Sequence, residues 1–257
     1  MNIRIVSTPS RYNAFYASRA GSKHDGKEEN NQDFGGVHVT DNHLFMAVCD
    51  GLGSCKHSRQ GAEIVVDLAV KFLEYHDWKK PFEAQARTFI AKTQKELETV
   101  AAKNGFSTQE MACTLLAFAV RGDMYRAMQL GDGFIVARFA SNAKFEMLFP
   151  SMEKEYASDV IPVTAADAIT SLLTREGSSM PHFVCLSSDG VERQAITQIY
   201  TSNEHPFAKF FEFLIDEVLP GGQEHLHQYL SLPFWNECTT DDRTLACALL
   251  SQPKGNQ

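Results

Sequence analysis

The chain has 257 residues, of which 44% are hydrophobic and 22% charged, and its formal net charge is −8. This composition predicts a globular protein with a sizeable core, and the negative charge argues against a nucleic-acid or anionic-membrane surface, which would need a basic patch. No apolar run reaches the ~18 residues of a membrane helix, and the N-terminus has no signal-peptide pattern. We therefore expect a cytoplasmic protein with no nucleic-acid and no membrane partner.

The six cysteines form no C-x-x-C pair and no metal-finger spacing. Cys113, Cys185 and Cys247 lie inside apolar runs of strand length. This placement predicts free, buried thiols in a reducing compartment.

The first part of the chain predicts strands followed by two helices. Residues 3–6, 11–20 and 44–49 have strand character, and the last of these runs ends at Asp-Gly. From residue 58 to about 78, apolar residues recur at helical spacing, with Ser58 as the expected N-cap. A second helix is expected over residues 81–103.

The middle of the chain returns to strand signals. Short apolar or alternating runs cover residues 113–120, 124–130, 134–139 and 144–149, and turn residues separate them. This spacing predicts an antiparallel meander.

The last part of the chain combines two strands and one apolar helix. Strands are expected over residues 182–186 and 245–250, before a polar tail at 251–257. The phenylalanine-rich segment 206–218 predicts a core helix rather than a partner groove, and Pro-Gly-Gly at 220–222 ends it. No repeat or linker divides the chain, so we expect one α+β domain over residues 1–250, with sheets packed together and helices outside.

Five aspartates stand in short, distinctive motifs that follow one another along the chain. The motifs are Asn31-Gln32-Asp33, Val48-Cys49-Asp50-Gly51-Leu52-Gly53-Ser54, Leu130-Gly131-Asp132-Gly133, Ser187-Ser188-Asp189-Gly190-Val191 and Asp241-Asp242-Arg243-Thr244. Taken singly, each Asp-Gly pair favours a plain turn, and Asp25-Gly26 in its polar stretch is interpreted as one.

Asp50, Asp132 and Asp189 differ from that turn because each follows a buried-type strand. A carboxylate at such a strand end is held at the rim of the core and partly dehydrated. Several of them together repel one another unless a cation lies between them. Carboxylate oxygens in a water-rich shell are the ligands that Mg²⁺ and Mn²⁺ prefer.

The ordered set NQD, VCDGLGS, MACTLL, LGDG, SSDG and DDRT resembles the bacterial branch of the PPM family, the PP2C-type metal-dependent serine/threonine phosphatases. The resemblance runs from about Gly21 to Leu250. It implies a PP2C-like, four-layer αββα sandwich of two antiparallel sheets flanked by helices. It also implies a two-metal site at one end of the sheets, occupied by Mn²⁺ or Mg²⁺.

The resemblance assigns a role to each motif aspartate. Asp50 would bridge the two metals, and the carbonyl of Gly51 would bind one of them. Asp189 and Asp241 would hold the first metal and Asp33 the second. Asp132 would help to hold a third, weaker metal. Thr114 matches a strand threonine of the family, for which we expect a packing role.

The implied reaction needs no protein nucleophile. Water bridging two divalent cations attacks the phosphorus of phosphoserine or phosphothreonine, and the cations neutralise the developing charge. Asp50, Asp189 and Asp241 would be catalytic through the metals that they hold. The expected partners are phosphorylated proteins, including a Ser/Thr kinase and its substrates.

The sequence departs from the family at several positions. Leu52 stands where many eukaryotic members have a histidine, which leaves the general acid open between a metal-bound water, His24 and His57. No arginine precedes Asn31, so Lys27 or His24 is the candidate for binding substrate phosphate, and a solvated loop charge is the alternative.

Three further departures concern the motifs themselves. Gln32 replaces a glutamate of some relatives, Gly133 a serine and Asp242 an asparagine; Asp242 is either an additional ligand or a surface acid. Two alternatives to a protein phosphatase stay open, the first of them because of Gln32 and the missing arginine. One is a metal-binding regulatory pseudophosphatase with little turnover, and the other is a phosphoesterase for small phosphate esters.

Overall fold

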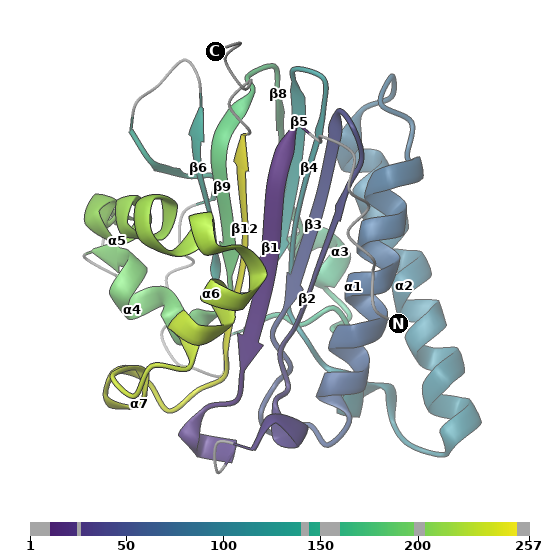
Figure 1. The fold of residues 1–257 in the computed structure, drawn as a ribbon. Coiled ribbons are helices and arrows are strands. Elements are labelled where there is room, and N and C mark those ends of the chain that lie inside the picture. The colour runs from purple at the N-terminus through teal and green to yellow at the C-terminus, as the bar shows by residue number, and fades with distance from the viewer. Residues whose placement is uncertain (1–10, 25–26, 140–143, 150–159, 198–203, 251–257) are drawn as a thin grey trace.

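The computed structural model describes residues 11–24, 27–139, 144–149, 160–197 and 204–250. Two five-stranded antiparallel sheets lie face to face, and helices cover the outer face of each sheet (Figure 1). This arrangement confirms the expected α+β class and the four-layer αββα sandwich.

The first sheet contains five antiparallel strands in the order β2-β3-β4-β5-β8. Their bounds are β2 Phe34–Val39, β3 His43–Cys49, β4 Leu115–Arg121, β5 Met124–Leu130 and β8 Leu173–Gly177. β3 and β4 are buried along nearly their whole length because both faces of this sheet are covered.

The second sheet has the order β1-β12-β9-β6-β7. Its strands are β1 Tyr12–Arg19, β12 Arg243–Leu250, β9 Pro181–Ser187, β6 Phe134–Phe139 and β7 Glu146–Met147. β1 pairs with β12 from Tyr12 opposite Leu250 to Arg19 opposite Arg243, so the first and last described strands are neighbours. A small two-stranded sheet joins β10 Ile196–Thr197 to β11 His205–Pro206.

Two long helices cover the first sheet, and several short ones cover the second (Figure 1). The first layer is α1 Ser58–Tyr75 and α2 Phe82–Asn104. The second layer is α4 Glu192–Ala195, α5 Ala208–Phe213, a π-helical turn at Leu214–Val218, α6 Gly222–Leu230 and α7 Trp235–Cys238. A further short helix, α3 Ala168–Ser171, precedes β8.

Three apolar clusters hold these layers together. One lies between the two sheets and includes Leu44, Phe118 and Val184. The second lies under α1 and α2, and the third lies under α5–α7 around Phe211 and Trp235. Each layer of helices therefore has its own core against its own sheet. None of the described helices is long and apolar enough to cross a membrane.

Most sequence-predicted elements are confirmed, including the strands at 124–130 and 134–139 with those bounds. All six cysteines are free; four are buried, and Cys55 and Cys238 are half-buried. The N-cap prediction for Ser58 is wrong, since Ser58 is the first helical residue and its hydroxyl donates to the carbonyl of Cys55 at 3.0 Å. The predicted strand 3–6 and tail 251–257 lie outside the described residues.

The predicted meander over residues 113–149 is only partly correct: β4 pairs with β5 and β6 with β7, but the two pairs lie in different sheets. β4 and β5 form a hairpin in the first sheet, but β6 belongs to the second sheet and pairs with β9. The chain crosses between the sheets at Gly131-Asp132-Gly133, where both glycines have positive φ angles of 87° and 82°. The same turn residues serve a hairpin and a crossing, so local sequence does not distinguish the two.

The single core helix predicted at 206–218 is also only partly correct. α5 ends at Phe213, and the chain continues as a π-helical turn. Phe210 and Phe211 are buried, whereas Phe207 and Phe213 are 42% and 45% exposed. Part of this segment is therefore surface.

Candidate metal and phosphate site

The strand ends beside which all five motif aspartates lie are at the same end of the two sheets, and β1 runs towards this end at the bottom of Figure 1. Each lies next to a strand terminus: Asp33 before β2, Asp50 after β3, Asp132 between β5 and β6, Asp189 after β9, and Asp241 shortly before β12. Antiparallel order places the start of one strand beside the end of its neighbour. The predicted aspartates therefore come together.

Asp50 lies at the centre of this group. Burial raises the pKa of its carboxyl group well above the usual range, and the charges of Asp33, Asp189, Asp132 and Asp241 raise it further. A shift with this cause shows that the four other carboxylates lie close enough to repel it.

The backbone around Asp50 is held by Thr114 at the start of β4. The hydroxyl of Thr114 accepts a hydrogen bond from Asp50 N at 2.9 Å, and Thr114 N donates to Asp50 O at 2.8 Å. The expected packing role is thus incomplete, because Thr114 positions the central aspartate through two hydrogen bonds. Sequence reasoning missed this role since the two residues lie 64 positions apart.

Gly51 follows Asp50 in a tightly packed position. A Cβ atom there would lie 2.6 Å from the carbonyl oxygen of Gln32 and 2.9 Å from the Cβ of Ser58. Only glycine fits between these segments. No side chain therefore blocks the backbone of Gly51 at the end of the sheets where the aspartates lie.

Asp33 is 1% exposed, and only one of its two carboxylate oxygens has a hydrogen-bond partner among the described residues. Its Oδ2 accepts a hydrogen bond from Ser188 Oγ at 2.6 Å, and its backbone N donates to Asn31 Oδ1 at 2.9 Å. Oδ1 has no hydrogen-bond partner among the described residues. Burial raises the pKa of Asp33 to about 8, although the Ser188 hydrogen bond opposes the shift. A buried carboxylate oxygen with no donor is suited to a cation.

Asp242 is not a surface acid, because its carboxylate is buried and links two loops. It is 3% exposed, and its two carboxylate oxygens accept hydrogen bonds from Gly21 N at 2.8 Å and Gln32 N at 2.7 Å. The alternative of a surface acid is therefore wrong, and the ligand role of Asp242 stays a prediction. The carboxylate fastens the segment before Asp33 to the loop that carries Asp241, and the amide of Gln32 adds a bond to Cys55 O at 3.2 Å.

The donor set fits hard divalent cations, although the side chains do not yet surround an ion. Within the described ranges, no three His, Cys, Asp or Glu side chains converge as a ready coordination sphere. The electrostatic coupling at Asp50 and the unpartnered Asp33 oxygen nevertheless point to the same place. Small rotations of carboxylates bring their oxygens together once a cation offsets their repulsion.

Lys23 is the cation that the structure places beside the carboxylates. Its Nζ lies 3.5 Å from Asp241 Oδ1, and the two side chains are 46% and 39% exposed. Its backbone N donates to Thr240 O at 2.8 Å, which holds it against the Asp241 loop. Sequence reasoning missed Lys23, because a contact with a residue more than 200 positions away leaves no local signal.

The predicted phosphate-binding and acid residues are less well supported. Lys27 is exposed at the start of a 3-10 turn, with no capping hydrogen bond. The side chain of His24 lies outside the described part of the chain. His57 stacks on Phe106 with ring centroids 4.0 Å apart, and its Nε2 lies 3.9 Å from Glu110 Oε2. These contacts give His57 a packing role at the start of α1.

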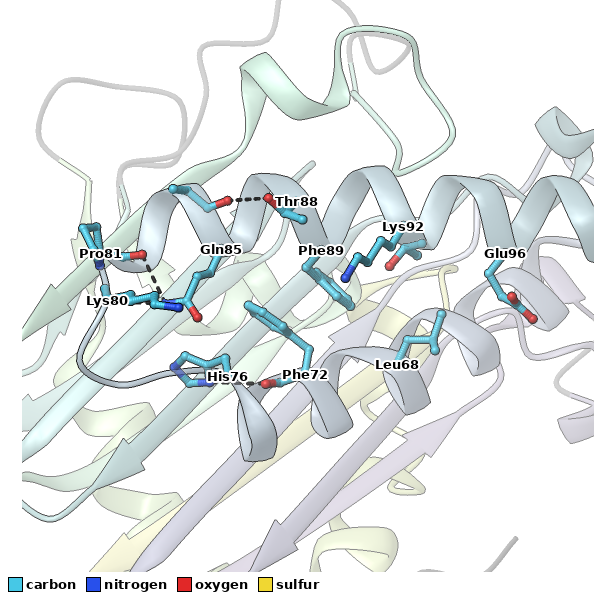
Figure 2. A pocket seen from close by; sticks show the side chains of 12 residues that line it. Leu68, Phe72, His76, Lys80, Pro81, Gln85, Thr88, Phe89, Lys92 and Glu96 are labelled. Carbon is cyan, nitrogen blue, oxygen red and sulfur yellow. Dashed lines mark hydrogen bonds between the residues drawn. The ribbon is translucent and has the colours of Figure 1, made fainter.

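A large groove lies elsewhere, between α1 and α2 (Figure 2). It has a volume of about 640 Å³, and its walls include Phe72, His76, Phe89 and Thr93. None of the five motif aspartates lines it. This groove is therefore separate from the carboxylate site.

Comparison with known proteins agrees with this geometry. The family model described as Protein phosphatase 2C matches residues 20–231. Serine/threonine-protein phosphatase 3 of Escherichia coli (strain K12) is 29% identical over 216 residues, which cover 81% of this chain and 85% of that protein.

Solved structures of the same kind share the fold. Serine/threonine phosphatase Stp1 from Staphylococcus aureus superposes with a TM-score of 0.66 at 17% identity, covering 98% of this chain and 100% of that one. PppA of Pseudomonas aeruginosa gives a TM-score of 0.63 at 16% identity, covering 94% and 99%. Since the family model spans most of the chain and the carboxylate motifs meet at one sheet end, the protein belongs to the protein phosphatase 2C family and is a protein phosphatase.

Proposed function

We propose that this protein hydrolyses phosphoserine and phosphothreonine in proteins with the help of two divalent cations, Mn²⁺ or Mg²⁺. The observation that carries the proposal is the environment of Asp50 at the end of β3, where burial and the charges of four further aspartates raise the pKa of its carboxyl group. Bound cations supply Lewis-acid chemistry that activates water and offsets phosphate charge. The serine/threonine specificity follows the named relative from Escherichia coli.

The ligands we propose are Asp33, Asp50, the carbonyl of Gly51, Asp189 and Asp241, with Asp132 for a third ion. Asp50 lies where it can be shared between two ions, since the other four carboxylates all act on it. Thr114, Ser188 and Asp242 hold the backbone and side chains of this group in place. These supporting contacts fix the carboxylates before any cation binds, which lowers the cost of assembling the site.

Lys23 is our candidate for binding the substrate phosphate. It is a half-exposed ammonium group at the rim of the carboxylates, where it can turn from Asp241 to an incoming anion. Lys27 and His24 remain weaker candidates on the same segment. The single domain that we propose runs through residue 250, because β12 pairs with β1 beyond the end of the family match.

The test is hydrolysis of p-nitrophenyl phosphate and a phosphothreonine peptide during Mn²⁺ titration, followed by EDTA. We expect activity only with the cation, and a loss of at least about 100-fold in Asp50→Asn because a central ligand is removed. Asp123→Asn is the matched control, since Asp123 is 76% exposed at the opposite end of β4 and β5. Calorimetry of Mn²⁺ binding gives a readout independent of turnover.

The results separate the alternatives. Mn²⁺ binding without turnover of any ester would favour a regulatory pseudophosphatase. Turnover of small esters but not of the peptide would favour a small-molecule phosphoesterase. Full activity of Asp50→Asn would show that the proposed ligand set is wrong. The protein substrates that we propose are a Ser/Thr kinase and the proteins that this kinase phosphorylates.

A further inference from the structure

The helical layer formed by α5, α6 and α7 has an unusually acidic surface. Residues 204–238 carry six acidic side chains and one basic one: Glu204, Glu212, Asp216, Glu217, Glu224 and Glu237 against Lys209. The layer on the other sheet is nearly balanced, since residues 58–104 carry seven acidic and eight basic side chains. Much of the net charge of −8 is therefore concentrated on one face.

The same layer exposes large aromatic side chains. Phe213 is 45% exposed and Phe234 is 39% exposed. The buried Tyr229 lies between them, with its ring centroid 5.7 Å from Phe213 and 6.4 Å from Phe234. We call these three residues the aromatic strip. Leu232, which is 46% exposed, lies close to it in the sequence. Exposed aromatic side chains that pack against one shared buried ring on a charged surface indicate a contact site.

Acidic side chains flank the aromatic strip. Asp216 and Glu217 follow Phe213 by three and four positions in a helical segment, and Glu237 follows Phe234 by three. Residues at these spacings share a helix face. All three acids are exposed. The surface thus combines aromatic rings with carboxylates at short range.

We propose that this surface docks a basic, apolar segment of the phosphoprotein substrate, away from the phosphorylated residue. Lysine and arginine side chains complement the carboxylates and can lie over aromatic rings, while an apolar side chain buries the strip. A second copy of the chain would bring two acidic faces together, and like charges disfavour that pairing. The inference rests on the proposed function.

The position of the strip relative to the carboxylates supports this assignment. Phe234 immediately precedes α7, and α7 leads directly into Thr239, Thr240 and Asp241. Thr239 N donates to Trp235 O at 3.0 Å, and Trp235 Nε1 donates to Tyr229 O at 2.9 Å. One short hydrogen-bonded segment therefore connects the aromatic strip to the loop that carries Asp241.

The test compares two phosphothreonine peptides that are identical around the phosphate. One carries an extension of alternating lysine and leucine, and the other carries glycine and serine of the same length. We expect kcat/KM to be about tenfold higher for the basic peptide, mainly through a lower KM. Docking away from the phosphate strengthens the binding of the ground state and of the transition state equally. The ratio of kcat/KM between the basic and the neutral peptide should fall at high salt, because salt screens exposed charges.

Two variants locate the effect on the protein. Phe213→Ala with Phe234→Ala, and Asp216→Asn with Glu217→Gln, should each remove most of the advantage and leave p-nitrophenyl phosphate hydrolysis unchanged. The matched controls are Tyr75→Ala and Glu98→Gln, which alter a 78% exposed aromatic residue and an exposed acid on the opposite layer. Equal loss in the controls would overturn the assignment of the site.

Binding of the unphosphorylated basic peptide, followed by fluorescence anisotropy, keeps this inference separate from the phosphatase activity. Binding that both double variants weaken supports the docking surface even if turnover fails. Normal turnover with no preference for the basic peptide overturns the docking surface and leaves the proposed function intact. Sedimentation that shows a dimer lost in Phe213→Ala with Phe234→Ala would assign this face to a second copy instead.

Discussion

The two helical layers cover five-stranded sheets of the same kind, yet they are built differently (Figure 1). α1 and α2 are 18 and 23 residues long and form a groove between them. The opposite layer consists of short helices, a π-helical turn and 3-10 turns, and it presents aromatic rings outward. Regular helices bury one continuous face, whereas short, irregular ones can bury some aromatic residues and expose their neighbours.

Both layers also connect to the carboxylates, but in different ways. α1 begins after the loop of Asp50, whose backbone is held by two hydrogen bonds to Thr114. α7 ends before Asp241, which is half-exposed and pairs with Lys23. One layer thus adjoins the aspartate whose backbone is held by β4, while the other adjoins the aspartate that pairs with an exposed lysine.

The largest expected effect is a difference in stability loss between truncating a buried aromatic residue of one layer and an exposed one of the other. Phe82 at the start of α2 is 1% exposed and lies under the guanidinium of Arg126, which is 5.3 Å from its ring centroid. Phe82→Ala should lower the free energy of unfolding by about 3–5 kcal/mol because it leaves a cavity. Phe213→Ala should cost less than about 1 kcal/mol, since Phe213 is already 45% exposed.

Urea denaturation of the two variants measures this contrast. Similar losses in both would show that Phe213 is part of the core of its layer. The exposed strip would then be an extension of the packing rather than a contact surface.

A smaller effect is expected from pH at the end of α1. Burial lowers the pKa of His76, and the charge of Arg126 lowers it further. Between the folded pKa and 6.5, the unfolded chain binds more protons than the native one, so the free energy of unfolding rises with pH in that window. The slope for one such group is at most about 1.4 kcal/mol per pH unit.

The comparison of wild type with His76→Gln isolates this contribution. The difference in the free energy of unfolding between the two proteins should grow in favour of the wild type from pH 5 to pH 7. A difference that does not depend on pH would show that His76 titrates normally in the folded protein.

The smallest effect is expected inside the groove between α1 and α2. Thr93 is 1% exposed, and its hydroxyl has no hydrogen-bond partner among the described residues. Thr88 and Thr99 on the same helix donate to carbonyls one turn earlier, each at 2.8 Å. Thr93→Val should therefore raise the free energy of unfolding by about 1 kcal/mol, because it removes a buried, unpaired hydroxyl.

Thr99→Val is the control on the exposed side of α2. Its hydroxyl is already paired, so the substitution should lower stability slightly or leave it unchanged. Differential scanning of the two variants measures the contrast. A loss of stability in Thr93→Val would indicate that the hydroxyl is satisfied by water in the groove.

Local sequence determined the strands, the first two helices and the residues at the carboxylate end. An apolar run followed by Asp-Gly marks a strand that ends in a turn, and this pattern placed Asp50 and Asp189 next to strand termini. The order of the motifs then indicated the family. These features are local because they depend on side-chain periodicity and on turn residues within a few positions.

Tertiary structure alone decided which loops meet. Thr114 bonds to Asp50 across 64 positions, and Asp242 bonds to Gly21 across 221. The same holds for Lys23 beside Asp241 and for the crossing between sheets at Gly131-Asp132-Gly133. Each depends on the order of strands in the two sheets, and the burial of distant apolar surface sets that order rather than any short pattern.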